Sequence, residues 1–184
     1  MRKSVFVATV LMLGGPFAGA VGSSFSFDPW LSKETGVTDV SLGGDWQFEG
    51  GSCFVTFAPH IDADYVYGVV WPCEGDNQMG FTMSLHRLDG TLLLVVGPES
   101  SDGLPLLLPV YLLFKVELDN DTMTLFSIDE DSFAWRAAGA SIEHKDSLVL
   151  SSTEELVSFL SWQVGDPSFF EEEPDFTFKK MESD

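Results

Sequence analysis

The chain has 184 residues, a length typical of a single domain. Its composition is 45% hydrophobic and 21% charged, which excludes a disordered chain and supplies enough apolar side chains for a core. Nine Lys and Arg against 29 Asp and Glu give a net charge of −20, which speaks against nucleic acids and anionic membranes as partners because both bind basic surfaces. The 16 Phe, 17 Gly and 9 Pro favour a β-rich fold with many turns.

Residues 1–20 have the pattern of a secretory signal peptide. Arg2 and Lys3 give a positive start, residues 5–13 are apolar, and Ala18-Gly19-Ala20 is a small-residue cleavage site. The apolar run is too short for a transmembrane helix, which needs about 20 residues. We therefore expect residues 1–20 to be removed and the protein to be exported, to the periplasm or the extracellular space, without stable membrane insertion.

Residues 21–43 are rich in Ser, Gly and Asp, and we expect a loosely ordered lead-in there. Residues 44–184 are predicted to form one β-barrel-like domain, because apolar and polar residues alternate in short segments. The predicted strands are 46–49, 53–57, 65–71, 81–86, 91–96, 110–118, 122–127, 148–150 and 176–179. Asp89-Gly90 and Asp119-Asn120-Asp121 predict tight turns between neighbouring strands.

One true helix is predicted near the end of the chain. Ser152 and Glu155 have the spacing of a capping box, apolar residues follow at helical spacing, and Gly165 predicts the end. Residues 129–138 are weakly helical, with Phe133 and Trp135 as expected anchors.

Tight turns make sequential strands antiparallel neighbours. A meander of about eight such strands removes its exposed edges by closing on itself. The expected fold is therefore mainly β: an antiparallel up-and-down barrel, or a curved half-barrel, with one C-terminal helix packed on it.

Two resemblances to known families support export and a barrel. Gly44-Asp45-Trp46 resembles the G-x-W signature of lipocalins, and so does the order of strands, one helix and a last strand. Residues 85–92, 108–116, 119–122 and 148–160 are similar to a family of uncharacterised exported bacterial proteins, many of them lipoproteins. That resemblance implies an exported envelope protein. The lipid-acceptor Cys of such lipoproteins is absent after the small residues of the signal peptide, so it does not imply a lipid anchor.

Motifs for catalysis, cofactors or metals are lacking. His60, His86 and His144 stand in no catalytic motif, and solvated surface histidines are expected at all three positions. Paired Asp residues occur, but without the spacing of a calcium loop. We expect no enzyme activity, no cofactor and no bound metal; a hydrolase using a carboxylate and a histidine has no motif behind it.

The two cysteines predict a disulfide, because an even count is typical of exported chains. If residues 52–58 and 68–73 form a hairpin, Phe57 lies opposite Val69 and Cys53 lies opposite Cys73 on the same face. Directly opposed residues have Cα atoms about 4.5–5.5 Å apart, which a disulfide can bridge.

Two functions fit these observations. In the first, a monomeric exported barrel binds a small apolar ligand inside. The candidate lining residues are Trp46, Phe57, Tyr65, Tyr67, Trp71 and Phe81. In the second, the barrel is filled and the protein is an envelope interaction module, chaperone-like or inhibitor-like, that acts through an exposed apolar surface. The acidity fits either an environmental adaptation or a basic partner.

Overall fold

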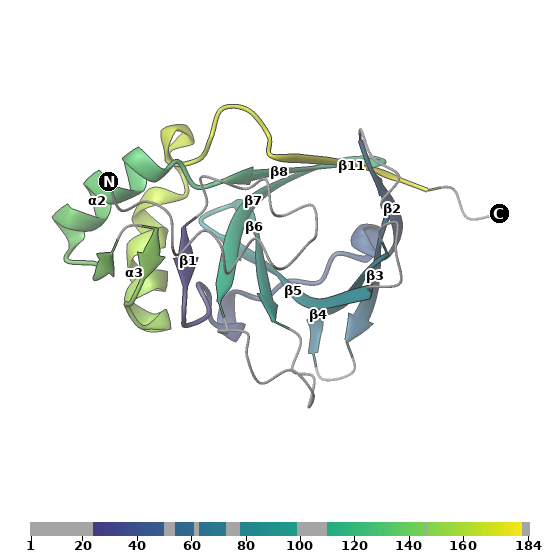
Figure 1. Ribbon diagram of the computed structural model, residues 1–184, viewed down its shortest axis with the longest axis horizontal. Helices are drawn as coiled ribbons and strands as arrows, with labels where there is room; N and C mark the ends of the chain where they lie inside the picture. Colours follow the sequence, from purple (N-terminus) through teal and green to yellow (C-terminus); the bar gives the residue numbers. More distant parts are fainter. Residues whose placement is uncertain are drawn as a thin grey trace.

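The computed structural model describes residues 24–49, 54–60, 63–72, 78–98, 110–145 and 147–181, and eight antiparallel strands among them form a closed barrel (Figure 1). These strands are β2 (Gly44–Phe48), β3 (Phe54–His60), β4 (Ala63–Pro72), β5 (Gln78–Leu88), β6 (Thr91–Pro98), β7 (Tyr111–Asp119), β8 (Thr122–Ser127) and β11 (Phe176–Lys180). They pair in the order β6-β5-β4-β3-β2-β11-β8-β7, and β7 pairs with β6 to close the ring. The expected fold class is confirmed, in its closed form.

The turns and register follow the sequence. Asp89 and Gly90 join β5 to β6 with φ angles of 46° and 85°, the left-handed pair that a type I′ turn requires. Asn120, with φ of 50°, is the left-handed residue between β7 and β8. Phe57 lies opposite Val69, which is the register that the disulfide prediction uses. Cys53 and Cys73 themselves lie outside the described residues.

Two helices lie together on one side of the barrel (Figure 1). Helix α3 (Thr153–Gln163) begins with the predicted capping box of Ser152 and Glu155. Helix α2 (Glu130–Ala140) is a full helix, and Asp129 caps its first turn by accepting a hydrogen bond from the Ser132 backbone N–H at 2.6 Å. Among the described helices, none combines the length and the apolarity that a bilayer crossing requires.

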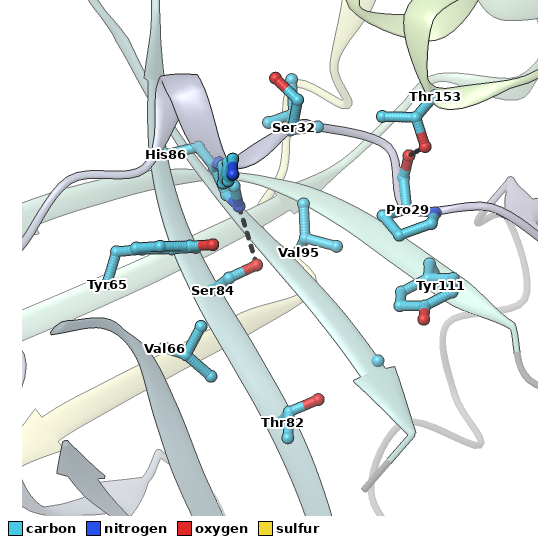
Figure 2. A pocket seen from close by; sticks show the side chains of 13 residues that line it. Pro29, Ser32, Tyr65, Val66, Thr82, Ser84, His86, Val95, Tyr111 and Thr153 are labelled. Atoms are coloured by element: carbon cyan, nitrogen blue, oxygen red, sulfur yellow. Dashed lines mark hydrogen bonds between the residues drawn. The ribbon is translucent and has the colours of Figure 1, made fainter. Parts of the chain in front are cut away.

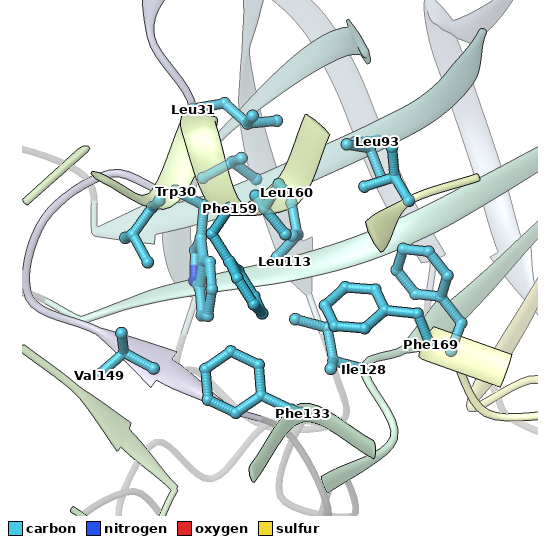
Figure 3. Close-up of a cluster of buried hydrophobic side chains, with 14 of the residues drawn as sticks. Trp30, Leu31, Leu93, Leu113, Ile128, Phe133, Val149, Phe159, Leu160 and Phe169 are labelled. Carbon is cyan, nitrogen blue, oxygen red and sulfur yellow. The ribbon is translucent and has the colours of Figure 1, made fainter. Parts of the chain in front are cut away.

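Apolar side chains gather in two clusters, one inside the barrel and one between the barrel and the helices. The inner cluster contains Leu42, Trp46, Val55, Phe57, Tyr67, Met83, Leu85, Leu94, Val96, Phe114, Val116, Met123, Leu125, Phe176 and Phe178. The outer cluster includes Trp30, Leu93, Leu113, Ile128, Phe133, Phe159, Leu160 and Phe169 (Figure 3). Its aromatic rings meet edge to face, with Phe133 and Phe159 centroids 5.7 Å apart. The expected anchor Phe133 is buried, whereas Trp135, two residues further along α2, is exposed, so that anchor prediction was wrong for Trp135.

The chain before β2 runs along the outside of the barrel and then over one end of it. Short strand β1 (Phe25–Ser26) pairs with β7 and with β10 (Leu148–Val149), which in turn pairs with β9 (His144–Lys145). Residues 29–36, here named the strap, cross the outer face, and the Trp30 indole N–H donates to the Tyr111 carbonyl at 2.9 Å. Residues 37–42, the cap, cover the barrel end, with Leu42 in the inner cluster.

Candidate functional site

Among the described side chains, three of the predicted ligand-binding residues lie in the barrel interior. Trp46, Phe57 and Tyr67 lie there, each at most 2% exposed. The rings of Phe57 and Tyr67 meet edge to face with centroids 6.2 Å apart. The side chains of Trp71 and Phe81 lie outside the described residues, although their backbones pair in β4 and β5.

Both polar groups of these interior side chains are satisfied by the cap. The Tyr67 hydroxyl donates to the Asp39 carbonyl at 3.0 Å and accepts from the Asp39 N–H at 3.2 Å. The Trp46 indole N–H donates to the Leu42 carbonyl at 2.8 Å. Neither group needs a polar guest, so this end of the interior is packed by the protein's own residues.

Tyr65 lies away from Tyr67, against the strap. Its ring contacts the His86 ring with centroids 5.7 Å apart, and it packs on Gly36 so closely that a Cβ there would lie 2.7 Å from the ring. The cause is a shift of register: Tyr67 pairs with Pro59, while Ala63 pairs with His60. Three residues of β4 thus have no partner on β3, and strict alternation of faces is lost there.

The helices present two exposed indole rings. Trp135 on α2 is 78% exposed and Trp162 on α3 is 83% exposed. Between the end of α2 and α3 lies a hollow of about 560 Å³. It is lined by Ala140, Ser141, Ile142, Glu154, Glu155, Ser158, Phe159, Trp162 and Gln163. These residues were not predicted as a site, because exposure of a single Trp on a helix is not visible in the sequence pattern.

Acidic side chains line this hollow. Glu154 and Glu155 are the charged residues among the described part of its lining. Hydrogen bonds from the Ser152 backbone N–H and hydroxyl lower the pKa of Glu155, which keeps its carboxylate ionised. Glu155, Phe159 and Trp162 fall at i, i+4 and i+7 of α3 and so share one helix face.

Arg136 of α2 binds the end of α3 and the turn that follows it. Its guanidinium donates to Gln163 and Asp166 at 2.7 Å each and to the Ser168 hydroxyl at 2.8 Å. The hydrogen bond with Arg136 is the main cause that lowers the pKa of Asp166 to about 2. The end of α3 is therefore held on α2 by a charge-assisted clamp.

A second hollow, here named the outer groove, lies between the strap and the outer face of the barrel (Figure 2). Its volume is about 390 Å³. It is lined by Pro29, Leu31, Ser32, Lys33, Tyr65, Val66, Thr82, Ser84, His86, Val95, Gly97, Tyr111 and Thr153. The Thr153 hydroxyl donates to the Pro29 carbonyl at 2.7 Å, so the start of α3 holds one end of the strap.

His86 is buried under the strap with 2% exposure, so the prediction of a solvated surface histidine was wrong for this residue. Its Nδ1 lies 2.9 Å from Thr35 Oγ1, and its Nε2 lies 2.8 Å from Ser84 Oγ. Thr35 donates its own proton to the Ser32 carbonyl, so it accepts from Nδ1–H. Nε2 then accepts from the Ser84 hydroxyl. Burial lowers the pKa of His86 to about 4 and keeps the ring neutral.

The Ser84–His86 pair has the hydrogen-bond direction of a nucleophile and its base. The base is weak, however, because efficient proton transfer near pH 7 needs a pKa close to 7. Thr35, the group behind the ring, is uncharged and cannot stabilise an imidazolium. The described residues contain no group of His, Cys, Asp and Glu that could hold a metal ion. The arrangement suits binding better than catalysis.

Comparisons of this chain with family models, with curated proteins and with solved structures gave no match. The two family resemblances of the sequence motifs therefore stay expectations.

Proposed function

We propose that this is an exported, non-enzymatic β-barrel protein that acts as an interaction module, binding a basic segment of an envelope protein through the face of α2 and α3. The observation that carries the proposal is the pair of indole rings on these helices, 78% and 83% exposed. Trp is enriched at the centres of protein interfaces, so two exposed indole rings on these helices favour a contact surface there.

The chemistry of the hollow supports a basic partner. An Arg or Lys side chain inserted there meets the ring of Trp162 and the carboxylates of Glu154 and Glu155. A cation over an indole face is attracted by about 0.5–2 kcal/mol, and charge complementarity with the −20 chain speeds association. Binding a small apolar ligand inside the barrel has less support, because the cap satisfies Tyr67 and Trp46.

Peptide titration tests the proposal. We expect a peptide with four arginines spaced by glycines to change Trp fluorescence and to bind with a Kd that rises with salt. Its counterpart with four glutamates should not bind. Trp162→Ala should weaken binding about tenfold, which corresponds to about 1.4 kcal/mol. Val40→Ala, at an exposed apolar residue in the cap, is the matched control. If Trp162→Ala and the parent bind the arginine peptide equally well, the binding is general charge attraction, and the proposal is contradicted.

A further inference from the structure

We propose that the outer groove is a separate binding site for a small, flat, largely apolar molecule that carries a hydroxyl or amide N–H and donates it to Ser84. A volume of about 390 Å³ falls at the small end of the range of about 300–1,000 Å³ typical of small-molecule sites. The groove is built from different residues than the hollow at α2 and α3.

Two tyrosines frame the groove, and each is positioned by a glycine. A Cβ on Gly36 would lie 2.7 Å from the Tyr65 ring, and a Cβ on Gly97 would lie 2.6 Å from the Tyr111 ring. Only glycine allows either ring to lie directly on the backbone. The phenol hydroxyls of Tyr65 and Tyr111 make no hydrogen bond within the described residues. Within the described residues, both rings thus offer a flat apolar face and an unbonded hydroxyl to an occupant.

Among the described residues, the lining of the groove is nearly without charge. It includes no Asp or Glu from the described part of the chain, and Lys33 is the one charged residue described there. Val66 and Val95 supply the apolar floor (Figure 2). An uncharged, mostly apolar molecule fits this lining better than an ion does.

The hydrogen-bond relay under the strap decides which polar group fits Ser84. Thr35 donates to Ser32, His86 Nδ1–H donates to Thr35, and Ser84 donates to His86 Nε2. The Ser84 hydroxyl proton is therefore used in the hydrogen bond to His86. The lone pairs of Ser84 Oγ can still accept a hydrogen bond from the groove side. A ligand with a donor at this place gains a hydrogen bond, whereas its methyl ether leaves the lone pairs of Ser84 Oγ without a donor from the ligand.

A matched pair of probes tests this: 2-naphthol, which has the donor, and 2-methoxynaphthalene, which lacks it. We expect 2-naphthol to bind at least tenfold more tightly, measured by probe fluorescence at pH 7. Ser84→Ala should abolish the difference between the two probes, whereas Ser161→Ala, at a serine of α3 that lines neither hollow, should preserve it. Gly97→Ala should weaken both probes, because Tyr111 must move. Each variant's fold is checked by its thermal unfolding curve.

The remaining outcomes overturn the proposal. If neither probe binds, the groove is closed or filled by the chain itself. If both probes bind equally to the parent protein, Ser84 does not select a donor. If Trp162→Ala abolishes naphthol binding, the probe occupies the helical hollow, and the groove is not its site.

Discussion

His86 shows how one covered residue couples the strap to the barrel. Its ring joins Thr35 of the strap to Ser84 of β5, and the neighbouring Gly36 forms a backbone bridge with it. Because the ring is buried and neutral, removing or charging it breaks the contact between the two elements. The stability of the fold should therefore depend on the protonation of this residue.

We predict that the protein loses stability as the pH falls from about 6.5 to about 4, owing to His86. Above this window the ring is neutral in both the folded and the unfolded chain. Within it, the unfolded chain binds a proton that the folded protein does not, because the folded pKa is the lower one. The free energy of unfolding should fall by about 2 kcal/mol at pH 5 and by about 3 kcal/mol at about pH 4, measured by urea denaturation.

His86→Gln, which has no ring to take up this proton, is the control for this prediction and should lack the loss between pH 7 and pH 5 that is due to His86. An imidazole NMR titration of His86 in the folded protein gives an independent readout. A midpoint near 6.5 for this ring would contradict the explanation.

The burial of His86 could not be predicted from its strand. Thr82, Ser84 and His86 share one face of β5, and in a hairpin such a polar face normally meets water. The strap covers it because Trp30 and Leu31 anchor in the outer cluster. These two apolar residues were the available signal, but alternation within β5 contains no information about a segment some 50 residues earlier in the chain.

Among the elements, α3 depends on its first turn. The Ser152 hydroxyl and Glu155 carboxylate satisfy each other's backbone N–H groups, and the following turn places Leu156, Phe159 and Leu160 in the outer cluster. We predict that Ser152→Ala lowers the free energy of unfolding by about 1 kcal/mol in urea denaturation, since it removes the hydroxyl that accepts from the Glu155 backbone N–H.

Ser158→Ala on the same helix is the matched control for the capping box of α3. Ser158 is exposed and lies inside the helix, where Ala has the better propensity, so its replacement should cost nothing. If Ser158→Ala lowers the free energy of unfolding as much as Ser152→Ala does, the loss is not due to the capping box.

Elements governed by local chemistry were predictable, and those governed by distant packing were not. The turns at Asp89-Gly90 and Asn120 and the capping box depend on a few adjacent residues, and all three are confirmed. In contrast, the pairing of β1 with β10 and the place of Tyr65 depend on contacts between segments far apart in the chain. The same holds for the hollow between α2 and α3.

At the scale of the whole molecule, closure of the barrel follows from the edges of the sheet. Strand β11 pairs with both β8 and β2, and β7 pairs with β6, so each of the eight barrel strands has two neighbours within the barrel. This closure was predictable, because an open meander leaves unpaired backbone groups. The packing of the interior was not predictable, because six aromatic positions suit a filled barrel and an open one equally.

The last prediction concerns a covalent link between β3 and β4. Thr56 lies opposite Val70 and Phe57 opposite Val69. If this register continues beyond the described pairs, Cys53 is expected opposite Cys73. A disulfide there closes a loop of about 20 residues, which in the chain-entropy model stabilises the fold by roughly 3 kcal/mol. For a domain of this size, the paired variant Cys53→Ser/Cys73→Ser should therefore melt roughly 6–12 °C below the parent. Thiol labelling of the denatured, unreduced, exported protein should find no free cysteine. Two labelled thiols per chain would show that the bond is absent, and the stability of the β3–β4 hairpin would then come from its backbone pairing and packing alone.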